Sequence, residues 1–143
     1  MSTWFITGAA GGLGLEIARA AVAGGHAVVA AACTREALPE DLQRSGRVLA
    51  YGSTSPAASG IAGAVATTVK RLGGIDVLVN NAGRGPLGAL EEITDAEARS
   101  LFDLNVCGLI NLTRAVLPGM RAAGGGKIVN IGSSIGAANI TQA

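Results

Sequence analysis

The chain has 143 residues, of which 49% are hydrophobic, and it contains 22 glycines. This apolar share excludes an intrinsically disordered chain, and a formal net charge of +1 without a basic cluster gives no electrostatic basis for binding nucleic acid or an acidic membrane surface. No apolar run reaches the roughly 18 residues of a membrane span, and the N-terminus lacks a signal peptide pattern. Cys33 and Cys107 lie far apart without metal-ligand spacing, so we expect one cytoplasmic domain without a metal site.

Short aliphatic runs alternate with longer helical patterns, which is typical of parallel βαβ units. Helix-end signals support the pattern: residues 94–97 read as a capping box, and glycines at 24–25 and 124–126 are helix stops. We predict a Rossmann-type doubly wound parallel sheet of at least five strands, with helices on both faces. In chain order the elements are strand 3–7, helix 13–23, strand 27–31, strand 47–51, helix 56–72, strand 76–80, helix 95–105, helix 108–123 and strand 127–132.

A glycine-rich turn joins the first predicted strand to the first predicted helix. It reads Thr7-Gly8-Ala9-Ala10-Gly11-Gly12-Leu13-Gly14. Free backbone N–H groups and the positive end of a helix favour a dinucleotide pyrophosphate at such a turn. Gly8 would form the turn, Gly12 would let the backbone approach the phosphates, and Gly14 would let the helix pack closely. A tight turn without a ligand is the alternative, whereas an ATP site of the Walker type would need a lysine after Gly14.

Four segments together resemble the short-chain dehydrogenase/reductase family. The glycine spacing after Thr7 is similar to the family's Thr-Gly-x3-Gly-x-Gly motif, and residues 80–83 are similar to its Asn-Asn-Ala-Gly motif. Asn105 resembles the family's active-site asparagine, and Ser133, after the apolar run 128–131, resembles its catalytic serine. The resemblance covers essentially the whole of residues 1–143 and implies an NAD(P)-dependent oxidoreductase that interconverts a small carbonyl substrate and an alcohol.

The resemblance also implies roles for individual residues. Ser133 would donate a hydrogen bond to the substrate carbonyl or the developing alkoxide. Asn105 would hold a water that links the family's catalytic lysine to solvent. The structural alternatives are a strand-end serine and a helix-packing asparagine. We assign cofactor binding to the glycine turn and to the ends of three strands, at Gly8, Gly11, Gly12, Leu13, Gly14, Cys33, Thr34, Ser53, Asn81, Ala82 and Gly83.

The residues after the second predicted strand bear on the choice between NAD and NADP. A carboxylate there would bind the adenosine ribose and select NAD, but this position is Ala32, and Thr34 and Arg35 could bind a 2′-phosphate. Against NADP, Gly11 stands where many NADP-preferring members have a basic residue. We predict NADP over NAD, because no carboxylate stands at the end of the second predicted strand. Ser53 stands where the family often has an adenine-contacting aspartate.

The resemblance further implies a catalytic Tyr-x3-Lys pair a little over a dozen residues after Ser133, beyond the last residue of this chain. Tyr51, the only tyrosine, lies on the adenine side and cannot replace it. We expect residues 1–143 to be the N-terminal part of a longer reductase. The alternatives are a non-catalytic NAD(P)-binding module, a truncated inactive fragment and, more distantly, a methyltransferase. Family members pair through the helix corresponding to residues 105–120, which allows a homo-oligomer.

Several polar residues are predicted to have no chemical role. His26 is expected in a surface connection between a helix and a strand. Cys107 is expected to be a small buried hydrophobe. Glu91, Glu92 and Glu97 are expected near a helix start, where carboxylates favour the helix dipole.

Overall fold

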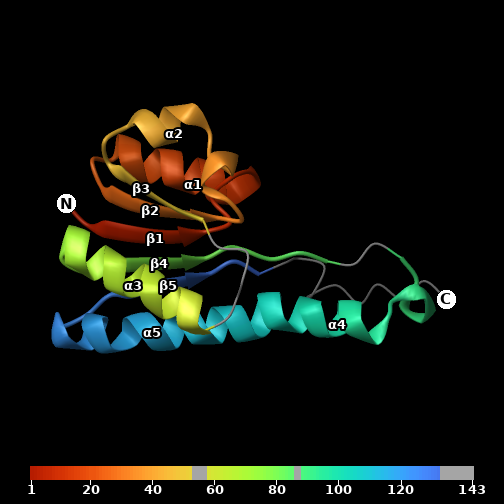
Figure 1. The fold of residues 1–143 in the computed structure, drawn as a ribbon. Helices are drawn as coiled ribbons and strands as arrows, with labels where there is room; N and C mark the ends of the chain where they lie inside the picture. The colour runs from red at the N-terminus through yellow and green to blue at the C-terminus, as the bar shows by residue number, and fades with distance from the viewer. Residues whose placement is uncertain (53–57, 86–87, 133–143) are drawn as a thin grey trace.

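The computed structural model describes residues 1–52, 58–85 and 88–132, which surround a five-stranded sheet (Figure 1). All strand pairs are parallel, and the strand order is β3-β2-β1-β4-β5. The carboxyl ends of the strands therefore share one edge, and the order reverses between β1 and β4, where open α/β sheets bind ligands. The strands are β1 (Thr3–Thr7), β2 (Ala27–Ala32), β3 (Val48–Gly52), β4 (Val77–Asn80) and β5 (Lys127–Asn130).

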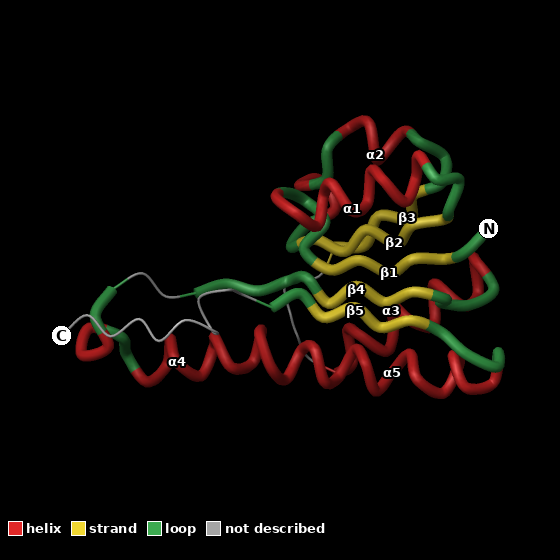
Figure 2. Tube along the Cα trace, turned by 180° about the vertical axis from the view of Figure 1, so that it is seen from behind, coloured by secondary structure: helices red, strands yellow, loops and turns green. Residues whose placement is uncertain are grey.

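Helices cover both faces of the sheet, with α1 and α2 on one side and α3 and α5 on the other (Figures 1 and 2). This arrangement confirms the predicted doubly wound fold. The helices are α1 (Gly12–Ala23), α2 (Glu40–Arg44), α3 (Ala58–Leu72), α4 (Asp95–Phe102) and α5 (Leu109–Ala122). Two 3₁₀ turns, Arg35–Ala37 and Leu90–Glu92, and a π-helical segment, Asp103–Gly108, complete the described elements.

The core consists of two apolar layers, one on each side of the sheet, because successive strand side chains point to opposite faces. Ile6 and Val79 pack in the layer beneath α1 and α2. Their neighbours Phe5 and Leu78 pack in the opposite layer, beneath α3 and α5. Strands that are buried on both faces explain why these runs read as nearly continuous hydrophobic sequence.

One continuous helix replaces the two helices predicted over residues 95–123. The π-helical segment, Asp103–Gly108, joins α4 to α5 across the predicted break between residues 105 and 108. The resulting helix, Asp95–Ala122, is long and apolar enough to cross a membrane by length and composition only. Its α5 half lies against the sheet through the buried residues Leu112, Val116 and Met120.

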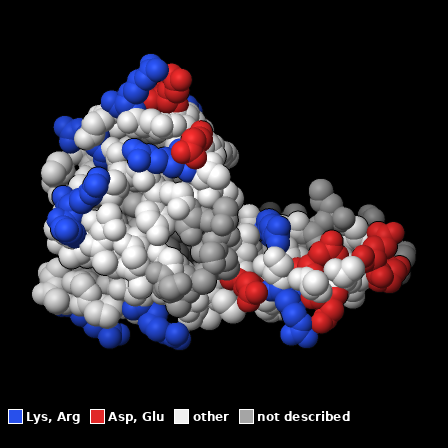
Figure 3. All heavy atoms as spheres, viewed as in Figure 1, with Lys and Arg blue, Asp and Glu red and all other residues white. Residues whose placement is uncertain are grey.

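The α4 half of this helix extends past the sheet and forms an arm with residues 88–94 (Figure 2). Asp and Glu side chains gather on this arm, as Figure 3 shows. Phe102 is 67% exposed and Val106 is 42% exposed, since no described element covers this side of the helix. Cys107 is exposed as well, so its predicted burial is wrong.

His26 is half-buried rather than a free surface residue. Its ring lies against that of Trp4, with centroids 5.7 Å apart, and its Nδ1 accepts a hydrogen bond from the Ser2 backbone N–H at 3.2 Å. It does lie in the predicted connection between α1 and β2, at the sheet edge opposite the glycine turn. The sequence did not reveal the contact because Trp4 lies in β1, far from His26 along the chain.

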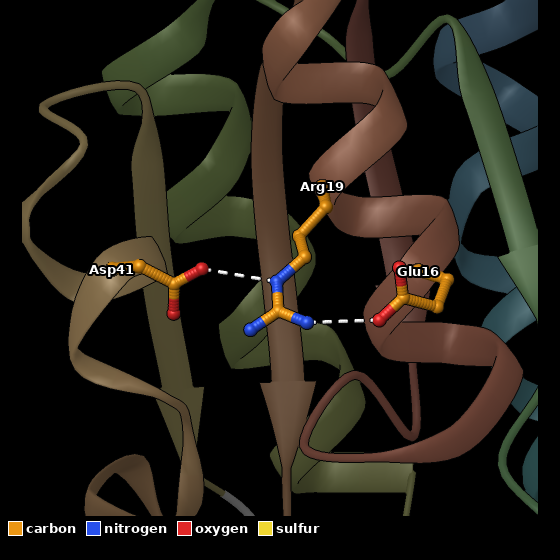
Figure 4. Close-up of polar contacts among 3 residues, drawn as sticks. All are labelled: Glu16, Arg19 and Asp41. Atoms are coloured by element: carbon orange, nitrogen blue, oxygen red, sulfur yellow. Dashed lines mark hydrogen bonds and ion pairs between the residues drawn. The ribbon is translucent and has the colours of Figure 1, made fainter.

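An ion-pair triad joins α2 to α1 on the surface of the upper layer (Figure 4). The Arg19 guanidinium donates through Nε to Asp41 at 3.0 Å and through NH1 to Glu16 at 2.8 Å. Leu38 and Leu42 fix the same segment from below, since both are 2% exposed within the core. The apolar contacts thus hold α2 on the sheet, and the triad fixes its position relative to α1.

The triad predicts a pH dependence of stability. The hydrogen bond from Arg19 lowers the pKa of the Asp41 carboxyl. A carboxyl whose pKa is lower in the folded state adds stability above its unfolded pKa, and this contribution disappears as the pH falls through the folded pKa. Urea unfolding of wild type and Asp41→Asn should therefore give different unfolding free energies at neutral pH and equal ones in acid. A difference that persists in acid would contradict this assignment.

Candidate functional site

The glycine turn lies at the carboxyl edge of the sheet, between the end of β1 and the start of α1. Gly8 and Gly12 have φ angles of +67° and +53°, a region that residues with a side chain rarely adopt. A Cβ on Gly12 would meet nothing within 4 Å, so the backbone there is open to a ligand. Gly11 and Leu13 are exposed beside it. The turn therefore presents the unblocked first turn of α1 that the sequence predicted.

Gly14 is buried and serves the packing of the turn itself. A Cβ at this position would collide with the Gly8 carbonyl oxygen and with the Asn81 side-chain amide. A Cβ on Gly8 would lie 2.9 Å from the same amide nitrogen. The close packing predicted at Gly14 is thus present. Its partners are Gly8 in the same turn and Asn81, the residue that follows β4.

A single hydroxyl, that of Thr7, connects the ends of β1 and β4. It accepts hydrogen bonds from the backbone N–H groups of Asn81 at 3.0 Å and Ala82 at 2.9 Å, and it donates to the Val79 carbonyl at 3.3 Å. One donor and two acceptor positions are all that a hydroxyl offers. The sequence marks Thr7 only as a motif position, yet its hydroxyl connects the residues of the site.

The Asn81 side chain completes this connection from the other strand. Its Nδ2 donates to the Thr7 carbonyl at 2.9 Å and to the Gly8 carbonyl at 3.3 Å. Both amide hydrogens therefore hold the glycine turn in place. The cofactor contact predicted for Asn81 would have to come from its remaining polar atoms, while Ala82 and Gly83 are exposed beside it.

Asn105 fixes the segment that follows these residues. Its Oδ1 accepts from the Arg84 backbone N–H at 3.0 Å, and its Nδ2 donates to the Arg84 carbonyl at 2.7 Å. The Arg84 guanidinium donates in turn to the Ser100 hydroxyl at 2.6 Å. Asn105 lies in the π-helical segment, and such segments are frequent at functional sites. Each amide atom keeps one further hydrogen-bonding position, where the predicted water could bind.

A second asparagine sets the register of the last described strand. Asn80 is 5% exposed, and its Nδ2 donates to Asn130 Oδ1 at 2.9 Å and to Thr113 Oγ1 at 3.2 Å. Asn80 and Asn130 are direct partners in the parallel pairing of β4 with β5. This bond fixes the strand that leads to Ser133. Ser133 itself lies outside the described residues, as does Ser53.

The predicted adenosine side lies at the ends of β2 and β3. Cys33 and Thr34 follow β2 and are both exposed. Arg35 begins the next 3₁₀ turn and is also exposed, and its guanidinium makes no hydrogen bond or ion pair within the described part of the chain. This end of the sheet therefore presents a thiol, a hydroxyl and a guanidinium, with the carboxylate of Glu36 one residue further on.

A small cavity of about 200 Å³ lies on the arm, away from the glycine turn. Three charged side chains line it, and each is already bonded within the protein: Arg84 to Ser100, Glu92 to the Ala89 N–H, and Glu97 to Thr94. The Thr94 hydroxyl and backbone N–H hold the pKa of the Glu97 carboxyl below its usual value. These bonds include the predicted capping box. The charged side chains that line the cavity therefore hold the structure of the arm itself.

The Thr7 hydroxyl provides the first test of this site. Thr7→Val removes the acceptor of two N–H groups, of which that of Asn81 is part-buried, and a buried donor left without a partner costs about 1–3 kcal/mol. We expect urea denaturation to show a loss of this size for Thr7→Val. Thr7→Ser keeps the hydroxyl and should lose much less. Equal losses for the two variants would contradict the role of the hydroxyl.

The crowding around Gly14 provides a second test. Gly14→Ala places a methyl group against backbone and amide atoms, and overpacking of this kind costs about 1–3 kcal/mol. Gly63→Ala is the matched control, because Gly63 lies inside α3 and a Cβ there meets nothing within 4 Å. Thermal unfolding should show a lower Tm for Gly14→Ala and an equal or higher Tm for Gly63→Ala. A Gly14→Ala variant as stable as wild type would show that the turn can relax.

Comparison with known proteins places the chain in the same family that its motifs resemble. The family model described as short chain dehydrogenase matches residues 2–143. A Streptomyces coelicolor protein assigned as a ketoacyl reductase is 40% identical, covering 96% of this chain and 55% of that protein. A 3-alpha-(or 20-beta)-hydroxysteroid dehydrogenase of Mycobacterium bovis is 37% identical over 93% of this chain and 52% of its own length.

Solved structures are similar in fold as well as in sequence. A short-chain dehydrogenase from Streptomyces avermitilis has a TM-score of 0.87 and 44% identity, covering 93% of this chain and 50% of that one. A metagenomic short-chain oxidoreductase in complex with NADP has a TM-score of 0.87 and 32% identity, covering 92% and 62%. The chain spans about half the length of the curated relatives it matches. Motifs, sheet topology and family model agree, and the chain belongs to the short-chain dehydrogenase family.

Proposed function

We propose that the chain forms the cofactor-binding part of an NAD(P)-dependent oxidoreductase that transfers hydride between a nicotinamide cofactor and a small ketone or alcohol. The observation that carries the proposal is the glycine turn at the switch point of the sheet. It is open at Gly12 and fixed from below by Thr7 and Asn81. Two of the relatives described above, a ketoacyl reductase by assignment and a hydroxysteroid dehydrogenase, are named for reactions at carbonyl or hydroxyl groups.

The residues present fit a nicotinamide dinucleotide. The N–H groups of the first turn of α1, from Gly12 onward, would hold the pyrophosphate at the positive end of the helix dipole. Cys33 and Thr34 would lie beside the adenosine ribose, and Gly83 would lie toward the nicotinamide half. The bound cofactor supplies the hydride acceptor or donor.

The chain's own residues would orient the substrate and support proton movement. Ser133 would donate its hydroxyl to the carbonyl oxygen, and Asn105 would hold a water from its fixed position beside Arg84. A carbonyl that receives a hydride also needs a proton. Tyr51 does not meet this need, because its hydroxyl donates to the Gly60 carbonyl at 2.8 Å. The proton donor in this proposal is a tyrosine outside residues 1–143, assisted by a lysine.

We further propose that NADP is preferred to NAD. The end of β2 has Ala32 and Cys33 where a carboxylate would repel a 2′-phosphate, and Arg35 has no ion-pair partner in the described structure. A guanidinium binds phosphate through charge-assisted hydrogen bonds. A solved relative with 32% identity was determined in complex with NADP, which supports a nicotinamide cofactor and does not distinguish NADP from NAD.

The two cysteines allow a direct test of cofactor binding. Both are exposed, but Cys33 lies at the proposed ribose site whereas Cys107 lies in the π-helical segment. Alkylation by iodoacetamide, followed by peptide mass spectrometry, should show that NADPH protects Cys33 and leaves Cys107 reactive. The NADPH concentration for half-protection should be lower than that of NADH. Equal labelling of Cys33 with and without either cofactor would contradict binding at this edge.

A further inference from the structure

The turn that would recognise the 2′-phosphate is held from two sides. Thr34 and Arg35 follow β2 and lead through the 3₁₀ turn Arg35–Ala37 into α2. On one side this turn touches the end of β3, and on the other it continues into the helix that the ion-pair triad attaches to α1. The first contact is made to the backbone of the turn itself, and the second acts on the turn through α2, so both bear on where the Arg35 side chain starts.

Gly52 makes the first of these contacts. It is the last residue of β3 and pairs with Ala32 at the end of β2. A Cβ on Gly52 would lie 2.8 Å from the Arg35 backbone nitrogen and 3.3 Å from Thr34 Cα. Its φ angle is not positive, so the missing side chain serves this close approach and not a special conformation. Any larger residue must displace the backbone of Thr34 and Arg35, because the contact is to main chain.

Asp41 makes the second contact through Arg19. Asp41 is the only residue of α2 with an ion pair to another element in the described structure, since the Glu40–Arg44 pair at 2.7 Å stays within the helix. The segment between α2 and Arg35 is short and internally bonded. Gln43 Nε2 donates to the Leu38 carbonyl at 2.6 Å, and the Leu38 N–H donates to the Arg35 carbonyl at 3.3 Å. A shift of α2 relative to α1 is therefore transmitted to Arg35.

We infer that Gly52 and Asp41 are specificity-determining positioning residues, which place the Thr34–Arg35 turn for the 2′-phosphate of NADP. This inference rests on the cofactor preference proposed above. Neither residue would touch the pyrophosphate or the nicotinamide. Their loss should consequently weaken NADPH binding while leaving NADH binding nearly unchanged, which a general structural defect would not do.

Isothermal titration calorimetry with NADPH and with NADH tests this inference. For Gly52→Ala we expect the ratio of the two Kd values to move toward NADH by about tenfold, the loss of roughly one good phosphate contact. Asp41→Asn should move the ratio in the same direction by a smaller factor. Glu40→Gln is the matched control, because it removes the same charge from the same helix without touching Arg19, and it should leave the ratio unchanged.

The outcomes separate the inference from the proposed function. A wild-type protein that binds NADPH no more tightly than NADH would overturn the cofactor preference and the inference with it. If wild type prefers NADPH, then an unchanged ratio in Gly52→Ala overturns the role of Gly52, and equal ratios in Asp41→Asn and Glu40→Gln overturn the role of Asp41. Circular dichroism checks the folding of each variant, and the Asp41 comparison decides the test if Gly52→Ala does not fold.

Discussion

The hydroxyl of Thr7 is the constraint on which the rest of the site depends. Strands β1 and β4 are adjacent in the sheet but far apart in sequence, and their carboxyl ends must be joined for a binding edge to form. Thr7 joins them by accepting from Asn81 and Ala82 while donating to Val79. With its one donor and two acceptor positions all occupied, the hydroxyl can adopt one orientation only.

The glycine turn takes its shape from this connection. Because Asn81 is held at Thr7, its amide can donate to the carbonyls of Thr7 and Gly8. The amide then occupies the space where a side chain on Gly14 would lie. Some residues that the sequence assigns to cofactor binding are thus partly structural. Gly14 and Asn81 build the turn, while Gly12 leaves it open to a ligand. Asn105 likewise has a structural role beside its predicted one, since its amide holds the Arg84 backbone.

Much of the fold could be predicted from the sequence, because buried parallel strands have strong local signals. The predicted bounds of β1 agree with the structure, and those of the other strands differ by at most two residues at either end. Helix α2 and the 3₁₀ turns were missed because they are too short for a helical period. The continuity of Asp95–Ala122 was missed because the predicted break falls inside the π-helical segment, a rare helical form that α-helical spacing does not describe.

The contacts that organise the site could not be predicted, since they depend on side chains from distant parts of the chain. Nothing local indicates that Thr7 reaches Asn81, or that the amide of Asn80 reaches Asn130. The burial expected of Cys107 was wrong for a related reason. Helical periodicity does not show which side of a helix is covered, and this side is exposed in the described structure.

Amide hydrogen exchange at Asn81 and Ala82 tests the central role of Thr7 most directly. Both amides lie beyond the end of β4, and Ala82 is exposed, so strand pairing gives no reason for protection. If the Thr7 hydroxyl holds both, they should exchange slowly and at similar rates, because a single group protects them. Exchange of both amides at the rate of freely exposed backbone would contradict the account.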